Sequence, residues 1–133
     1  MPFVVDASVS ACWAFEDEEH PVAAMALDRT RWDKAFAPSL WWFELRNTLV
    51  MNERRGRLTQ ADTAAFLLLL PSFGITLDDA PDEAMVLALA RRHRLTAYDA
   101  AYLALARRLH APLATLDRAL AAAAIAERLP ALA

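Results

Sequence analysis

A short apolar run followed at once by an aspartate occurs twice in this chain, once toward each end. Phe3–Val5 precedes Asp6, and Pro112–Leu116 precedes Asp117. Apolar runs of this length without polar alternation predict short strands that are buried on both faces, as in a parallel sheet. Because the carboxyl ends of parallel strands meet at one edge of a sheet, where α/β sites form, we expect the two aspartates to lie together.

Between these runs, helical patterns alternate with two more short apolar runs. The further strands are expected at Ala35–Ala37 and Gly74–Leu77. Helices are expected at about residues 9–15, 21–34, 40–54, 60–71, 81–93 and 99–109, with an alanine-rich helix after Asp117. This alternation predicts an α/β fold, a three-layer α/β/α sandwich with a short parallel sheet. Residues 1–133 contain no repeat or linker, so a single domain is expected.

The composition limits where such a chain can work. Of its 133 residues, 57% are hydrophobic and only 2 are glycine, which favours a packed core over disorder. No run approaches the ~20 apolar residues of a membrane span, and the N-terminus lacks the basic leader of an export signal. The single cysteine, Cys12, cannot form an internal disulfide and is expected to be buried rather than reactive. We therefore expect a cytoplasmic protein without membrane association.

The charge pattern leaves nucleic-acid binding open. The formal net charge is −3, which by itself disfavours contact with phosphates. The basic residues are nearly all arginines, which suit bidentate phosphate contacts. They gather at Arg54-Arg55-Arg57, Arg91-Arg92-Arg94 and Arg107-Arg108. The alternative is that these arginines are solvated side chains at helix C-termini, where the helix dipole favours cations.

Two further acids, Glu44 and Asp99, are placed to join the two strand-end aspartates. Glu44 lies in the apolar helical stretch Leu40–Leu45, where a carboxylate is costly to bury unless it is paired or binds a metal. Asp99 lies at the start of the helix that leads to the last strand. Each acid also has a plain structural explanation: the three aspartates as parts of helix N-caps, and Glu44 as a partner of Arg46 or Asn47.

Together, the four acids indicate a metal site. Four carboxylates that meet without a cation would repel one another, and their pKa values would rise. Mg²⁺ or Mn²⁺ relieves this repulsion and prefers oxygen ligands. Ions held by carboxylates are a common device for phosphodiester hydrolysis. The candidate catalytic and metal-binding residues are therefore Asp6, Glu44, Asp99 and Asp117.

Four stretches occur in order along nearly the whole chain: VVDASVSACWAF, the glutamate of LWWFELRN, LTAYDAAYLALA and LATLD. In this order they resemble the PIN domain, and more narrowly the VapC-type toxins of bacterial toxin–antitoxin pairs. The resemblance implies a parallel sheet between helices and an acidic quartet that binds Mg²⁺ or Mn²⁺ and cuts RNA. By position, the same four acids match the quartet, and Ser8 and Thr115 match polar positions often found beside it.

The resemblance also implies a function and partners. The chain would be an endoribonuclease, the toxin of a type II VapBC-type toxin–antitoxin system, with RNA as substrate, a cognate antitoxin as partner and a homodimer as its assembly. In the mechanism that we infer, Asp6 and Asp99 chiefly hold the metal, and Glu44 and Asp117 support it directly or through water. A water attacks phosphorus in line and the 3′ oxygen leaves, which gives a 5′-phosphate and a 3′-hydroxyl.

Two other functions are compatible with parts of the pattern. One is a non-catalytic binding module with the same fold, whose acidic pocket takes an arginine from a protein partner. The other is a receiver or phosphatase that uses a strand-end aspartate together with a lysine. It fits poorly, because the only lysine, Lys34, precedes the second strand.

The remaining conspicuous residues are expected to be structural. The aromatic residues of the first and third helices are expected to pack in the core, with a groove for an antitoxin or a second copy as the alternative. Trp41 and Trp42 are adjacent on one helix and cannot face the same way, so one of them could reach a surface. None of the three histidines, His20 among them, has metal-ligand spacing, and all are expected near helix ends. Tyr102 is expected in the core, and Tyr98 nearer the mouth of the site.

Overall fold

Four short strands form a fully parallel sheet in the order β3-β2-β1-β4. The computed structural model describes residues 1–132. The strands are β1 (Phe3–Val5), β2 (Ala35–Pro38), β3 (Thr76–Asp78) and β4 (Leu113–Ala114). Val4 of β1 aligns with Phe36 of β2 on one side and with Leu113 of β4 on the other. The first and last strands are therefore neighbours, which brings their following aspartates to the same edge.

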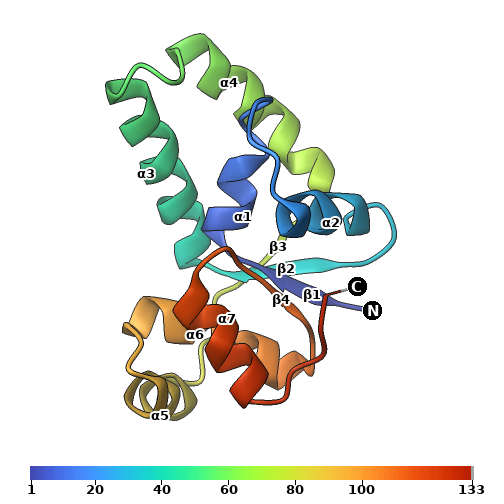
Figure 1. Cartoon of the computed structure of the whole chain (residues 1–133), viewed down its shortest axis with the longest axis vertical. Helices are drawn as coiled ribbons and strands as arrows, with labels where there is room; N and C mark the ends of the chain where they lie inside the picture. Colours follow the sequence, from blue (N-terminus) through green and yellow to red (C-terminus); the bar gives the residue numbers. More distant parts are fainter. Residues whose placement is uncertain (133) are drawn as a thin grey trace.

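Helices cover both faces of this sheet (Figure 1). They are α1 (Ala7–Cys12), α2 (Pro21–Arg29), α3 (Leu40–Arg54), α4 (Gln60–Leu69), the 3₁₀ helix η1 (Leu70–Phe73), α5 (Glu83–His93), α6 (Ala97–Leu109) and α7 (Arg118–Ala126). Helices α1 to α4 lie on one side and α5 to α7 on the other, so the expected three-layer arrangement is confirmed. Within residues 1–132, no helix is both long and apolar enough to span a bilayer.

Strand β1 supplies both halves of the core, because successive residues of a strand point to opposite faces. Val4 belongs to a larger cluster that includes Leu103 of α6 and Leu45 of α3, whereas Phe3 and Val5 belong to a second cluster. All five side chains are completely buried. Burial on both faces explains why this strand is uniformly apolar rather than alternating.

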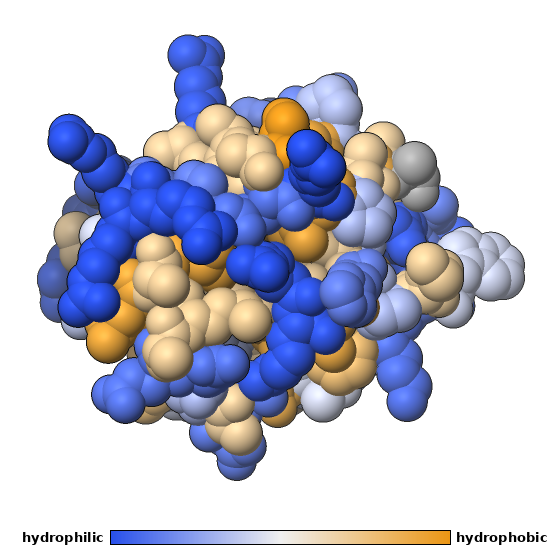
Figure 2. Space-filling model, turned by 90° about the horizontal axis from the view of Figure 1, so that it is seen from below, coloured by the Kyte–Doolittle hydropathy of each residue, from blue (hydrophilic) through white to orange (hydrophobic). Residues whose placement is uncertain are grey.

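Helices α5, α6 and α7 are joined by a group of ion pairs around Glu127. Its carboxylate lies 2.8 Å from Arg92 Nη1, 2.6 Å from His93 Nε2 and 3.1 Å from Arg107 Nη1. The face of the molecule on which α5 and α7 lie is largely hydrophilic, with apolar patches between the polar side chains (Figure 2). Charged side chains therefore both cover these helices and connect them.

The second helix is shorter than the sequence predicts. A helix is expected to about Lys34, but α2 ends at Arg29. The Thr30 hydroxyl donates a hydrogen bond to the Leu27 carbonyl at 2.6 Å, and the chain continues in turns. Trp32, expected on the helix, is consequently 79% exposed.

The first helix also differs from its expected bounds, whereas the third agrees with them. Helix α1 begins directly after its N-cap Asp6 and ends at Cys12, although the pattern predicts a helix over about residues 9–15. Helix α3 has the predicted limits, Leu40–Arg54, and the chain turns after it at Gly56, where φ is +74°. Glycine adopts this left-handed conformation without strain.

Candidate active site

Asp6 is the most deeply buried of the four acids. It follows β1 directly and is only 5% exposed. Its Oδ1 accepts hydrogen bonds from the Val9 N–H at 3.0 Å and from the Ser8 hydroxyl at 2.7 Å, and its Oδ2 accepts one from the Thr115 hydroxyl. The helix-cap explanation therefore holds for Asp6. It does not exclude a role in a site, because Oδ2 retains a second acceptor position.

The hydroxyls of Ser8 and Thr115 also hold the end of β4 against the end of β1. Ser8 Oγ accepts a hydrogen bond from the Leu116 N–H at 3.0 Å, and Thr115 Oγ1 accepts one from the Asp117 N–H at 3.0 Å. Because both hydroxyls donate to Asp6 at the same time, the two strand ends cannot separate without breaking these bonds. Asp117 is thereby placed beside Asp6, and its own carboxylate caps α7.

Glu44 approaches the same region from the N-terminal half of α3. The residue is half-buried, and its Oε1 accepts a hydrogen bond from the Tyr102 hydroxyl at 2.6 Å. The expected alternative of a local pair with Arg46 is wrong. The Arg46 guanidinium donates to the Trp42 carbonyl at 3.2 Å and lies 3.9 Å from the centre of the Trp42 ring.

Asp99 comes from α6, on the other side of the sheet. It is the third residue of the helix, and its N–H donates a hydrogen bond to the Thr96 hydroxyl at 3.1 Å. Thr96 rather than Asp99 therefore caps the helix. The Asp99 carboxylate is not needed for the cap, and it lines the cleft together with the other acids.

The four acids line one open cleft of about 280 Å³. They reach it from four separate places: the end of β1, helix α3, the start of α6 and the start of α7. The other lining residues are Ala7, Ser8, Asn47, Thr48 and Tyr102. No lysine or arginine is among the residues that line this cleft in the described structure, so its walls carry an excess of negative charge.

Burial and mutual repulsion disfavour the ionised forms of three of these acids. Burial raises the pKa of Asp6 above its ordinary value, and the charge of Asp99 raises it further. The hydrogen bonds that Asp6 accepts lower the pKa but do not cancel this rise. Burial also raises the pKa of Glu44, and the charges of Asp99 and Asp6 raise it further. The pKa of Asp99 is raised by burial and, in addition, by the charge of Asp117. Each shift has the direction that a cation in the cleft would reverse.

The donor set of the cleft fits a hard divalent ion that keeps part of its water. It consists of carboxylate and hydroxyl oxygens, which Mg²⁺ and Mn²⁺ prefer. Within residues 1–132, no three of these carboxylates bring oxygen atoms within 4.8 Å of one another. In this arrangement an ion could contact at most two carboxylates directly. Water would complete its coordination, as is usual for Mg²⁺.

A family model of the PIN domain matches residues 3–126, a range that includes all four acids. The chain belongs to the PIN-domain family. It is 34% identical over 141 residues to Ribonuclease VapC3 of Pyrobaculum aerophilum, and the match covers 99% of this chain and 98% of that protein. The crystal structure of PAE2754 from Pyrobaculum aerophilum superposes with a TM-score of 0.70 at 26% identity, covering 92% of this chain and 79% of the other. The resemblance to VapC-type PIN domains is thereby confirmed.

Three polar residues that line the cleft of this PIN domain are absent from the site predicted from sequence. Asn47 and Thr48 follow Glu44 by three and four residues, a spacing that places them on the same helix face. Tyr102 follows Asp99 by three residues on α6 in the same way. It is 1% exposed, as expected for a core residue, but its hydroxyl reaches Glu44. Helical spacing from each acid is the signal that could have identified them.

Other conspicuous side chains of the PIN domain lie away from the cleft. Trp41 is buried and Trp42 is 44% exposed, so one of the two does reach the surface. Tyr98 is 66% exposed and does not line the cleft, contrary to expectation. Burial raises the pKa of the Cys12 thiol to about 11, with the charge of Glu18 adding to it, so this thiol is protonated at neutral pH and is a poor nucleophile.

Proposed function

We propose that this PIN domain is a metal-dependent endoribonuclease that hydrolyses RNA phosphodiester bonds with Mg²⁺ or Mn²⁺, and that residues 1–133 act as a single catalytic domain. The observation that carries the proposal is the cleft itself, on which four carboxylates from four separate elements converge without a basic side chain among the lining residues. The relationship to a protein named as a ribonuclease supports the same activity.

Asp6 and Asp99 would hold the ion most directly, with Glu44 and Asp117 supporting it, in part through water. The negative charge that these acids share makes cation binding favourable. When bound, the ion offsets the charge of a substrate phosphate and lowers the pKa of a water molecule for in-line attack on phosphorus. We expect cleavage products with a 5′-phosphate and a 3′-hydroxyl.

Hydroxyl side chains in the cleft and beside it position these acids, and an exposed amide in the cleft is placed to meet the substrate. Ser8 and Thr115 fix the two oxygens of Asp6, and the Tyr102 hydroxyl fixes Oε1 of Glu44. Without these bonds the carboxylates could rotate, and the ion would lose part of its binding site. Asn47 is exposed in the cleft, and its side-chain amide carries two hydrogen-bond donors suited to RNA phosphate oxygens.

We further infer that the protein is the toxin of a type II VapBC-type toxin–antitoxin system in the cytoplasm, with a cognate antitoxin and a second copy of itself as partners. The relationship to a VapC protein supports this role. Large apolar side chains exposed on α3 and α4 offer surface for such partners: Trp42, Phe43, Leu68 and Leu69. Light scattering of the chain, alone and co-expressed with the product of a neighbouring antitoxin gene, tests both assemblies. A monomer at all concentrations would contradict the homodimer.

Cleavage of a mixed pool of small RNAs by the purified chain tests the catalytic proposal. The reaction is compared with Mg²⁺, with Mn²⁺ and with EDTA, beside the variant Asp99→Asn. Asp79→Asn is the matched control, because Asp79 is an exposed aspartate outside the cleft. We expect metal-dependent cuts that Asp99→Asn loses and Asp79→Asn keeps. Absence of cleavage with every metal by a folded chain would instead favour the non-catalytic binding module.

A further inference from the structure

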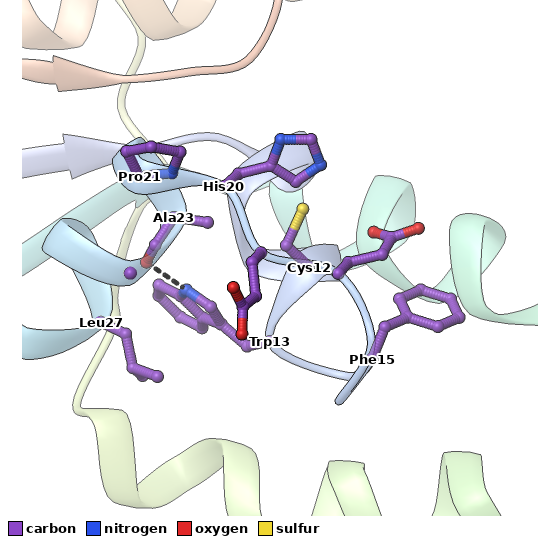
Figure 3. A pocket seen from close by; sticks show the side chains of 10 residues that line it. Cys12, Trp13, Phe15, His20, Pro21, Ala23 and Leu27 are labelled. Carbon is purple, nitrogen blue, oxygen red and sulfur yellow. Dashed lines mark hydrogen bonds between the residues drawn. The ribbon is translucent and has the colours of Figure 1, made fainter.

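A second cluster of metal-ligating side chains lies outside the acidic cleft. Cys12, Glu18 and His20 each offer one ligand atom, and these three atoms lie within 4.8 Å of one another. Across residues 1–132, no other three histidine, cysteine or acidic side chains come so close. The Cys12 sulfur and the His20 ring face the same hollow (Figure 3). From sequence, Cys12 is expected only as a buried small residue and His20 only as a helix-end residue, so the cluster is a finding of the structure.

The turn between α1 and α2 brings these side chains together. Cys12 is the last residue of α1, and His20 precedes α2 as its N-cap without making a side-chain capping bond. Trp13 Nε1 donates a hydrogen bond to the Ala23 carbonyl at 3.0 Å, which fixes the turn against α2 (Figure 3). The His20 ring is therefore held near Cys12 without being used to cap the helix.

Glu18 is fixed from the other side of the turn. Arg57 Nη2 donates to Glu18 Oε1 at 2.5 Å, a bond that leaves Oε2 uninvolved. Glu16, Asp17 and Glu19 are its neighbours in sequence, and Glu19 also lines the hollow. Four consecutive acids with one arginine partner give this part of the surface a negative potential, which attracts cations.

We propose that Cys12, Glu18 and His20 form a binding site for a borderline-soft divalent transition-metal ion, of which Zn²⁺ is the representative. Thiolate, imidazole and carboxylate are the ligand types of zinc sites in proteins, and the bound ion would displace the proton that the Cys12 thiol otherwise carries. Three protein ligands leave one position of a tetrahedral ion open, and the hollow of about 500 Å³ has room for water or a small ligand there. The acidic cleft offers only oxygen, so the two places select different classes of ion.

An ion at this site would join the end of α1 to the start of α2. The opposite end of α1 begins at Asp6, so the ion would hold the helix that Asp6 caps. The fold holds the three ligands in place, whereas the unfolded chain must order them at a cost in entropy, so binding favours the folded state. We therefore expect Zn²⁺ to raise the Tm of the metal-free chain, and His20→Gln to remove most of that rise.

Direct binding of Zn²⁺ to the purified, reduced chain tests the site, with a chromophoric chelator as competitor. All variants are made in an Asp99→Asn background, called the parent. This substitution reduces the Zn²⁺ binding that the acidic cleft contributes to the measurement. In this parent, His20→Gln is expected to weaken Zn²⁺ binding at least about tenfold. His110→Gln is the matched control and is expected to leave binding unchanged, because His110 is an exposed histidine outside the cluster.

Co²⁺ provides a second measurement that reports on the thiolate. Co²⁺ bound through Cys12 gives a sulfur-to-metal charge-transfer absorption, which Cys12→Ser is expected to lose and His110→Gln to keep. Circular dichroism checks the fold of each variant. His20 is exposed, so His20→Gln decides the matter if Cys12→Ser fails to fold. Equal Zn²⁺ affinity in His20→Gln and its parent, or no Zn²⁺ binding by the parent, would overturn the proposal.

Discussion

At the scale of single residues, the same acids serve both the fold and the cleft. Asp6 caps α1 and Asp117 caps α7, and both line the cleft. In the sequence, the cap and the site are competing explanations for each aspartate. In the structure Asp6 and Asp117 cap helices and also line the cleft, because an N-cap uses only one oxygen of a carboxylate, whereas Asp99 lines the cleft and Thr96 caps its helix. The positions of the acids were predictable because strand ends and helix starts are readable in the sequence, whereas the atoms by which Ser8 and Thr115 contact Asp6 were not.

The variant Asp6→Asn is expected to lose RNA cleavage by about 100-fold or more while it remains folded. The amide keeps an acceptor for the Val9 N–H and removes a buried charge. Because burial raises the pKa of Asp6, the wild-type chain in EDTA loses stability as the pH rises from the ordinary carboxyl range through that raised value. The variant avoids this loss. Urea denaturation in EDTA is therefore expected to favour the variant more at pH 7 than at pH 4. Wild-type cleavage by Asp6→Asn would remove Asp6 from the site.

The variant Tyr102→Phe tests whether a hydroxyl in the core positions Glu44. The Tyr102 hydrogen bond lowers the pKa of Glu44 against the effect of burial, so its loss is expected to raise that pKa further. Cleavage is expected to fall about 10-fold to 100-fold, as for other groups that orient metal ligands. NMR titration of the Glu44 carboxyl carbon measures the pKa. A Glu44 pKa that is unchanged by the substitution would show that the bond contributes little.

At the scale of elements, local signals predicted most of the fold and tertiary contacts decided the rest. Helix α3 has its predicted bounds because Pro38-Ser39 and Gly56 mark its two ends. Strand β4 has only two residues, although the apolar run Pro112–Leu116 predicts more, because its partner β1 ends at Val5, opposite Ala114. The cluster at Cys12 depends on the shape of a turn, and no spacing rule for helices or strands would have revealed it.

Helix α4 contains one polar atom that the fold leaves unsatisfied. Thr63 Oγ1 is buried without a hydrogen-bond partner in residues 1–132. Thr63→Val keeps the shape of the side chain and removes the hydroxyl, so it is expected to stabilise the chain by about 1 kcal/mol. Thr59→Ala is the opposing control, because it breaks the capping box with Asp62 and is expected to cost about 1 kcal/mol. Urea denaturation measures both. A loss of stability in Thr63→Val would contradict the prediction.

At the scale of the whole molecule, several of the clustered arginines form ion pairs with acidic side chains of the same chain. Arg57 pairs with Glu18, Arg92 and Arg107 with Glu127, and Arg108 with Asp78. These arginines are therefore ion-paired rather than only solvated at helix C-termini, and carboxylates already engage the guanidinium groups that a phosphate would contact. With a net charge of −3, the protein is expected to hold RNA mainly through its cleft and the ion bound there.

The variant Glu127→Gln tests how strongly the ion pairs around Glu127 join α5, α6 and α7. The Glu127 side chain is 8% exposed. Burial raises its pKa, but the hydrogen bonds from His93 and Arg92 outweigh this and hold the pKa below its ordinary value. The ionised Glu127 carboxylate therefore stabilises the folded state at pH values above the ordinary carboxyl pKa. This stabilisation is lost as the pH falls through the lowered pKa of Glu127. We expect Glu127→Gln to cost about 2 kcal/mol at pH 7 and clearly less once the pH falls below the lowered pKa of Glu127.

Urea denaturation at the two pH values measures this difference. Glu83→Gln is the control, because Glu83 is an exposed acid in the first turn of α5. It is expected to change stability by less than about 0.5 kcal/mol. An equal cost of Glu127→Gln at both pH values would show that the charge of Glu127 is not what joins the helices.

The pairing of β1 with β4 has a consequence for how the protein is made. During translation, residues 3–5 leave the ribosome first, but their neighbours on one side, Leu113 and Ala114, are among the last to emerge. Asp6 therefore lacks its Thr115 partner, and Asp117 its position, until synthesis is nearly complete. A nascent chain, or one shortened by premature termination before β4, cannot assemble the cleft. The RNA cleavage that we propose for the cleft is therefore expected only after β4 has been synthesised and paired with β1.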